Sequence, residues 1–174
     1  MSYRKRLADF TQDGGWTALN DASSGVTTVS TAWSSTACLQ FDKVDGTGFF
    51  IGGAYSARTI TPHTRKFDIS HLISPDDYVS WVINISSLTD VASCCVRIGT
   101  SVSHYLEWTV LDSSLTAARW SRCAVRLGDA TIVGNGCNWR DIRYVAVGVT
   151  FDGEDDALAD IEVDALSICS ADQV

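Results

Sequence analysis

The sequence has no long hydrophobic run. No stretch approaches the roughly 20 consecutive apolar residues that a membrane-spanning helix requires. The N-terminal segment MSYRKRLADF carries charges but no apolar segment after them, so it lacks the features of a secretory signal or a membrane anchor. We therefore expect a protein that is synthesised in a cytoplasm and has no membrane partner.

Positive charge is scarce. The chain has 13 Lys and Arg against 21 Asp and Glu, a net charge of −8, and such a surface repels nucleic-acid phosphates. We expect no nucleic-acid partner. The one basic run, Arg4-Lys5-Arg6, predicts a short N-terminal arm at residues 1–6. Such an arm is either a solvated terminus or a contact for an acidic neighbour.

Motifs for catalysis or metal binding are also missing. His63, His71 and His104 lie outside any nucleophile-elbow or cysteine-protease signature. The acidic run at 152–156 lacks the ligand pattern of an EF-hand loop, and no cysteine pair has the C-x-x-C spacing of a zinc site. We therefore predict that the protein is not an enzyme. The acidic run is interpreted as a solvated hairpin tip or as a contact for a basic partner.

The cysteines are best explained as free thiols. In a cytoplasm thiols stay reduced, and a free cysteine behaves as a small buried hydrophobic residue. A cross-sheet disulfide formed after release from the cell stays open as an alternative. The six cysteines are Cys38, Cys94, Cys95, Cys123, Cys137 and Cys169.

The clearest periodicity is two, which places alternate side chains on opposite faces of a strand. The segments 78–85, 120–127 and 144–151 alternate in this way and predict strands with one buried face. Weaker strand candidates, enriched in β-branched or aromatic residues, are 7–10, 26–30, 38–41, 49–51, 65–69, 94–98 and 104–110.

Helical candidates are short, at 72–77, 111–118 and 138–141, and none is long enough for a crossover between parallel strands. Glycine-rich turns separate the strands, as at Gly52-Gly53 and Gly134-Asn135-Gly136. About ten short strands in 174 residues predict an all-β protein, a two-sheet antiparallel β-sandwich or jelly roll. The length predicts a single domain over residues 1–174.

The last strand breaks its own alternation. Its apolar face runs through Ile161 and Val163 and then resumes at Leu166 and Ile168, on the opposite parity. One extra residue in the strand would restore the phase. We therefore predict a β-bulge near Asp164.

Several aromatic and apolar motifs follow one another in an order that spans most of the chain. They are 7–10 with Trp16, 67–70 before the strand at 78–85, 96–99 before 105–108, 139–144 before the strand at 144–151, and 163–168 at the end. In this order they resemble the galactose-binding-like jelly rolls, which occur as carbohydrate-binding modules and as accessory domains of tailed-phage structural proteins.

The resemblance implies a passive role. Among phage proteins it implies a virion structural protein: a capsid decoration or cement protein, or a tail or baseplate accessory protein. Such a protein would stabilise the particle through contacts with other virion proteins, as a homo-oligomer such as a trimer. The location expected is then the virion, after synthesis in the host cytoplasm. The alternative is a carbohydrate-binding module that recognises a glycan without catalysis.

In many sugar-binding relatives a structural calcium joins an acidic residue after the first strand's Phe to the Asp of the closing strand. Asp164 matches the closing position, whereas Thr11 follows Phe10, which leaves Asp9 or Asp13 as substitutes. The resemblance thus implies a structural calcium at Asp9 and Asp164. The alternative is no cofactor, with Asp164 accepting hydrogen bonds from backbone amides at the bulge.

The chain is rich in tryptophan. Trp81 and Trp108 lie on alternating strands and are predicted to anchor the core. Trp33 and Tyr55 are flanked by small polar residues or glycine. They are our candidates for contact with a sugar or a protein partner.

Overall fold

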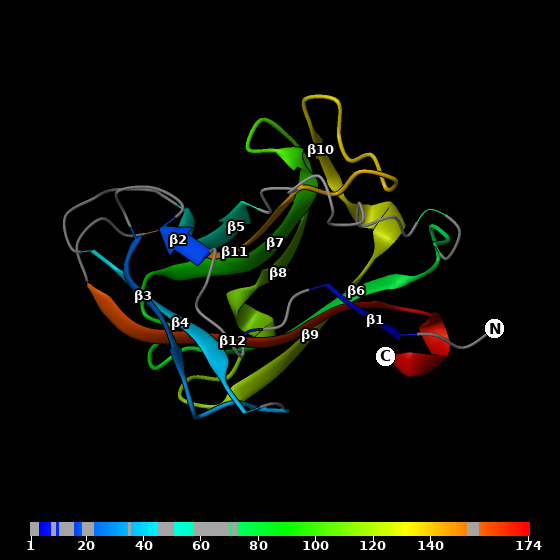
Figure 1. The fold of residues 1–174 in the computed structure, drawn as a ribbon. Coiled ribbons are helices and arrows are strands. Elements are labelled where there is room, and N and C mark those ends of the chain that lie inside the picture. The colour runs from blue at the N-terminus through cyan, green and yellow to red at the C-terminus, as the bar shows by residue number, and fades with distance from the viewer. Residues whose placement is uncertain are drawn as a thin grey trace.

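The computed structural model describes residues 4–7, 10, 16–18, 23–34, 36–44, 51–57, 70, 73–152 and 157–174, with the backbone alone for 5, 23 and 51–57. These residues form two antiparallel β-sheets packed as two layers (Figure 1), which confirms the predicted β-sandwich. Predictions at Asp9, 49–50, 65–69 and 153–156 lie outside the described residues.

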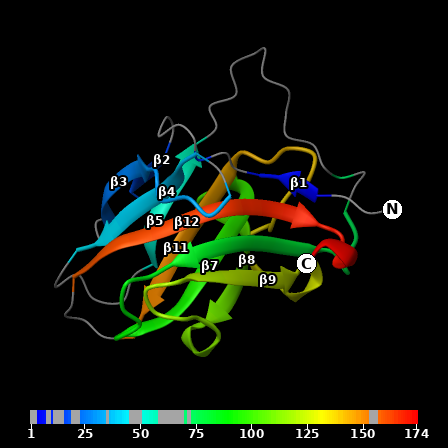
Figure 2. The ribbon, with the colours of Figure 1, turned by 90° about the horizontal axis from the view of Figure 1, so that it is seen from below.

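Sheet A is the lower layer in Figure 1 and faces the viewer in Figure 2, which looks from below. Its order is β3-β4-β12-β6-β9, and β1 also pairs with β12. The strands are β1 (Arg4–Arg6), β3 (Ser23–Val29), β4 (Cys38–Lys43), β6 (Tyr78–Asn84), β9 (Trp120–Arg126) and β12 (Leu158–Cys169).

Sheet B is the upper layer in Figure 1, in the order β10-β8-β7-β11-β5-β2. Both sheets turn one face of alternating apolar residues towards the other, as the period of two predicts. The strands are β2 (Trp16–Ala18), β5 (Ile51–Ala57), β7 (Val91–Ser101), β8 (His104–Leu111), β10 (Thr131–Val133) and β11 (Tyr144–Phe151).

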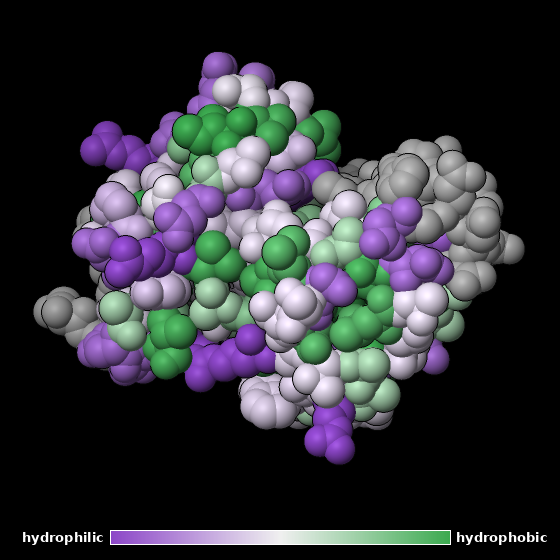
Figure 3. All heavy atoms as spheres, turned by 180° about the vertical axis from the view of Figure 1, so that it is seen from behind, coloured by the Kyte–Doolittle hydropathy of each residue, from purple (hydrophilic) through white to green (hydrophobic). Residues whose placement is uncertain are grey.

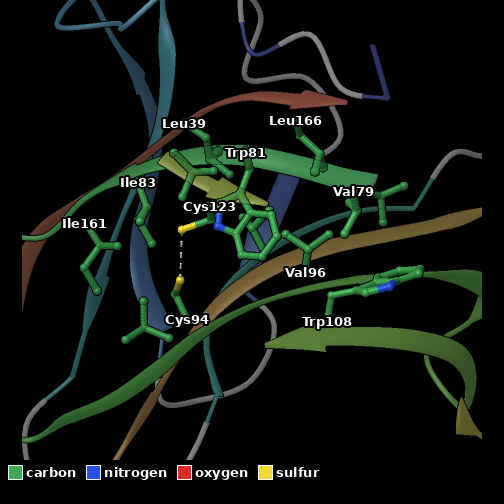
Figure 4. Packing of buried hydrophobic residues seen from close by; sticks show 14 of the residues in the cluster. Leu39, Val79, Trp81, Ile83, Cys94, Val96, Trp108, Cys123, Ile161 and Leu166 are labelled. Carbon is green, nitrogen blue, oxygen red and sulfur yellow. Dashed lines mark hydrogen bonds between the residues drawn. The ribbon is translucent and has the colours of Figure 1, made fainter. Parts of the chain in front are cut away.

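The core between the layers contains the predicted tryptophan anchors. Trp81 on β6 and Trp108 on β8 are both fully buried (Figure 4). The indole N–H of Trp108 donates to the carbonyl of Arg126 at 3.1 Å. This bond satisfies the buried donor and ties sheet B to the end of β9 in sheet A.

The predicted bulge in the last strand is confirmed. The register of β12 against β6 shifts between Asp164 and Ser167, and Ala165 adopts a φ of 57°. Leu166 and Ile168 return to the core, both fully buried. One extra residue therefore keeps both apolar halves of β12 on the inner face.

The N-terminal segment differs from the prediction. Arg4–Arg6, expected to belong to an arm, form β1 against the end of β12 (Figure 2). Leu7 and Phe10, expected in a strand, lie outside any strand but are buried in the core. The ladder ends where the Leu7 amide donates to the Leu166 carbonyl at 2.9 Å, because the bulge in β12 breaks the register there.

Two other expectations are corrected. The strands at 78–85 and 144–151 are buried on both faces, since Val82 and Ala146 on their outer faces are covered as well. The helix expected at 111–118 is reduced to a 3₁₀ turn at Asp112–Ser114, and 138–141 is a turn. Segments this short do not offset the cost of helix nucleation. Of the expected 72–77 helix, residues 73–77 are irregular.

Among the residues that the structure describes, the large hydrophobic side chains that are exposed are those of Trp33, Val102, Leu111, Ile132 and Val174. On the face seen from behind, hydrophobic residues form small groups between hydrophilic ones (Figure 3). Among the described residues no helix is long and apolar enough to cross a membrane.

The cysteines are all free and five of the six are buried, Cys137 being half-buried. Burial raises the pKa of the Cys38 thiol to about 11 and that of Cys137 to about 12. In an unfolded chain the pKa of a cysteine thiol is about 8.5. Above that pH the unfolded state loses protons that the folded state keeps, so alkaline pH favours unfolding.

We therefore expect the free energy of unfolding to be insensitive to these thiols below about pH 8.5 and to fall between there and about pH 11. The decline is at most about 1.4 kcal/mol per pH unit for each thiol. Urea denaturation across this range measures it. A Cys38→Ala, Cys137→Ala double variant should decline less steeply, and an equal decline would assign the effect to other groups.

Candidate functional site

The structure places the two aromatic candidates on different sheets. Tyr55 belongs to β5 in sheet B, where its backbone pairs with Ala146 and Thr17. Trp33 lies in the segment that follows β3 and contacts Trp120 of β9 in sheet A, with ring centroids 6.4 Å apart. The two residues therefore belong to different sheets of the sandwich.

Six residues pair in register across sheet B and form a cross-strand row. The inner positions of β7 and β11, such as Val96 and Val147, are buried in the core, so Arg97 and Ala146 lie on the opposite face. Six strands at about 4.8 Å spacing make the row about 24 Å long. The row runs through Thr17, Tyr55, Ala146, Arg97, Glu107 and Thr131.

Arg97 is the centre of a polar and aromatic cluster on this face. Its Nε donates to Glu107 Oε2 at 2.6 Å, and both side chains are partly exposed, at 15% and 20%. The guanidinium also lies 4.6 Å from the centre of the Tyr105 ring and interacts with the hydroxyl of Tyr144. Because both Glu107 and the Tyr105 ring contact the guanidinium, its plane is held in one orientation.

Tyr105 and Tyr144 belong to the next row along the sheet. They flank Gly99 of β7, and their rings approach to 5.8 Å. A Cβ at Gly99 would come within 2.1 Å of the His104 carbonyl oxygen, so only glycine fits between them. Burial raises the pKa of both tyrosines, which therefore stay neutral and keep a hydroxyl that donates and accepts.

Sequence reasoning missed these residues. Arg97 and Glu107 are charged residues inside predicted strands, and this signal was available in the sequence. Of the three histidines only His104 is described, and its Nδ1 accepts a hydrogen bond from the backbone N–H of Asn135 at 3.0 Å. His104 therefore stabilises the turn beside β10.

On the outer face of sheet A, the segment 31–34 crosses over β12 and β6. Thr31 donates its hydroxyl to Glu162, which also accepts from Asn84 Nδ2 at 2.9 Å. Further along the segment, the Ser34 amide donates to Asp164 Oδ2 at 2.9 Å. These bonds hold Trp33, which is 57% exposed, above the sheet.

Asp164 is fully buried and its carboxylate is surrounded by donors. Ser34 donates through its amide and its hydroxyl, the Ala165 amide donates to Oδ1 at 2.6 Å, and Arg6 approaches Oδ1 to 3.5 Å. Calcium requires about six to eight oxygen ligands instead. Asp164 thus has the arrangement expected of a carboxylate that caps the bulge.

The described residues around Asp164 do not fit a calcium site. Within the described part of the chain, no group of three or more His, Cys, Asp or Glu side chains could hold a metal ion. Asp9, the other expected ligand, lies outside the described residues. Calcium therefore stays a prediction that these contacts do not support.

The fold defines the class. It is a β-sandwich of the kind found in carbohydrate-binding modules. The family 11 module of a cellulosomal cellulase of Clostridium thermocellum superposes with a TM-score of 0.63 at 12% identity, over 98% of this chain and 96% of that one. The family 30 module of another cellulosomal cellulase of that organism gives 0.61 at 11% identity, over 98% and 99%.

A further structure contains a family 11 module from the same organism in complex with a β-1,3-1,4-mixed-linked tetrasaccharide. It superposes with a TM-score of 0.62 at 12% identity, over 97% of this chain and 96% of that one. No protein-family model matches the chain, and a search of curated proteins finds no match. At these identities the likeness establishes the fold alone.

Proposed function

We propose that this protein binds a glycan without catalysis, along the outer face of sheet B. The observation that carries the proposal is the cross-strand row that contains Arg97 and Glu107, together with Tyr105 and Tyr144 beside it. The row crosses the sheet from β2 to β10. Beyond β11 its exposed part consists of Arg97, Glu107 and Thr131 on the neighbouring strands β7, β8 and β10.

The chemistry of the row suits a carbohydrate. Sugar hydroxyls both donate and accept, and a fixed guanidinium and carboxylate side by side offer both partners in one place. Tyr105 and Tyr144 are buried, so they hold the Arg97 guanidinium in place rather than present a ring to the sugar. Ala146 on β11 is buried as well, so a sugar would contact the exposed part of the row, at Arg97, Glu107 and Thr131. Charged and polar side chains from three neighbouring strands thus lie side by side on the exposed part of this face.

The similar structures support the same class of function. They are carbohydrate-binding modules of almost the length of this chain, and one of them is in complex with a tetrasaccharide. Neither the fold nor the described residues supply a positioned nucleophile and base. Recognition without turnover is therefore the activity that we propose.

The virion role expected from the sequence stays a prediction, and so does the trimer. The similar structures bear on the fold and on glycan binding rather than on assembly into a particle. We therefore propose glycan binding, rather than particle stabilisation, as the function. Mass spectrometry of purified particles tests the virion role separately.

Replacing Arg97 by glutamine should weaken glycan binding at least about tenfold, because glutamine cannot supply a charged, forked donor. A glycan array first identifies a ligand, and calorimetry with that ligand then compares the variants. Arg122→Gln is the matched control, since Arg122 is exposed on sheet A and its replacement makes the same change in charge. Thermal unfolding checks that both variants fold.

Two results would contradict the proposal. One is an array on which the folded protein binds no glycan. The other is an Arg97→Gln variant that binds as tightly as the Arg122→Gln control. The variant Arg97→Lys retains the charge but not the forked donor. Weakened glycan binding in this variant while it remains folded would show that the loss of binding is not caused by unfolding.

A further inference from the structure

A small hollow opens on the outer face of sheet A, beside the segment that carries Trp33. Its volume is about 230 Å³, and its walls come from β1, β12 and Ser34. Arg4 and Arg6 are alternate residues of β1, so both lie on the same side of the strand. The lining residues are Arg4, Arg6, Ser34, Ala165 and Ser167.

The walls of this hollow are rich in donors. Each guanidinium carries five N–H groups, and the two serine hydroxyls can also donate. Arg4 Nε reaches Ser167 Oγ at 3.3 Å, which leaves its remaining N–H groups for other acceptors. Two cations in one hollow contrast with the net charge of −8 of the chain. The hollow therefore attracts an anion.

The nearest carboxylate does not cancel this attraction. Asp164 is fully buried and its oxygens accept from the Ser34 and Ala165 amides. Arg6 Nη2 lies 3.5 Å from Asp164 Oδ1, and the Arg6 side chain remains 42% exposed. Asp164 thus orients Arg6 from below while the guanidinium stays accessible from above. The arginines are positioned before any ligand arrives.

An exposed ring next in the chain to a residue of the hollow indicates the kind of anion. Trp33 precedes the lining residue Ser34 in the chain and is 57% exposed, with Trp120 packed against it. An exposed indole braced by a second indole is a surface on which a sugar ring can pack. We propose that this surface binds an acidic saccharide, with its carboxylate or sulfate group in the hollow and its ring on Trp33.

This second site is independent of the row on sheet B. The two surfaces lie on opposite outer faces of the sandwich, so either can fail while the other holds. The probes are a galacturonic acid trisaccharide, its methyl ester and inorganic sulfate, each measured by calorimetry. The free acid should bind at least about tenfold more tightly than the ester, and added salt should weaken it.

The variants assign the interaction to residues. Arg4→Gln and the double change Arg4→Gln, Arg6→Gln should each weaken binding of the free acid, the double change at least about tenfold. Trp33→Ala should weaken the trisaccharide and leave sulfate unaffected. Arg140→Gln, an exposed arginine elsewhere, is the matched control for charge. Arg4→Gln keeps the Asp164 contact of Arg6 intact, so it reports on binding even if the double variant is unstable.

Three results would overturn the proposal. The first is equal affinity for the acid and its ester. The second is equal affinity of the Arg4→Gln and Arg140→Gln variants for the free acid. The third is a Trp33→Ala change that leaves trisaccharide binding intact, because the hollow would then hold a simple anion rather than a saccharide. Loss of glycan binding in Arg97→Gln alone would leave this site standing.

Discussion

Replacing Asp164 by alanine lowers the free energy of unfolding by about 3–5 kcal/mol. The carboxylate is fully buried at the bulge of β12 and joins three separate parts of the chain. Without it the Ser34 and Ala165 amides lose their acceptor, and Arg6 of β1 loses the carboxylate with which it forms an ion pair. Unsatisfied buried donors are expensive, and here two are created together.

A graded series separates the hydrogen bonds from the charge. Asp164→Asn keeps one acceptor oxygen and should lose less, about 1–3 kcal/mol. Asp129→Ala removes an exposed carboxylate and serves as the control, with an expected change within about 0.5 kcal/mol. Urea denaturation gives each value. If Asp164→Ala behaves like the control, the carboxylate does not organise the bulge.

The sequence predicts most of the fold because apolar residues alternate within the strands, and this pattern is visible in each short segment by itself. The strand at 144–151 coincides with β11, and the bulge near Asp164 follows from the change of parity between Val163 and Leu166 alone. The N-terminus is different. Nothing local marks Arg4–Arg6 as a strand, since β1 exists only through its pairing with β12.

The candidate site depends on a register that the sequence does not reveal. Ser101 pairs with His104 across the turn, and an unbroken ladder from there would place Arg97 opposite the core residue Trp108. The register shift between Gly99 and Ser101 places Arg97 opposite Glu107 instead. A shift of one residue decides whether the charged side chains meet on the outer face.

The thiols provide another case of proximity without a local signal. Cys94 lies on β7 of sheet B and Cys123 on β9 of sheet A, 29 positions apart in the chain. Their sulfur atoms approach to 3.7 Å across the core (Figure 4). The sequence predicts that each is a buried thiol, but only the packing of the two sheets pairs them.

A disulfide between Cys94 and Cys123 should stabilise the protein by about 2–4 kcal/mol. The chain-entropy estimate for a closed loop of about 30 residues lies near the upper end of this range. The sulfur atoms must move from 3.7 Å to about 2.0 Å. Close-packed layers resist that movement, so we expect part of the entropic gain to be lost as strain.

The folded protein should nevertheless resist this oxidation. The hydrogen bond shared with Cys123, together with burial, raises the pKa of the Cys94 thiol, and the thiolate is the reactive form. We therefore expect oxidised glutathione to leave the native pair reduced. Refolding in oxidised glutathione should instead form the bond, because two exposed thiols then lose two protons and two electrons to the oxidant, which is reduced to thiol.

Peptide mapping with intact-mass analysis identifies the bonded pair, and urea denaturation of the oxidised and reduced forms measures the gain. A Cys123→Ala variant refolded in the same way is the control, since it keeps Cys94 but cannot form the bond. Mapping to another pair, or an oxidised form less stable than the reduced one, would show that the sheets cannot close on this bond. A gain within the expected range would mean that the two layers tolerate a covalent link at their centre, and that the reduced thiols are retained by burial rather than by geometry.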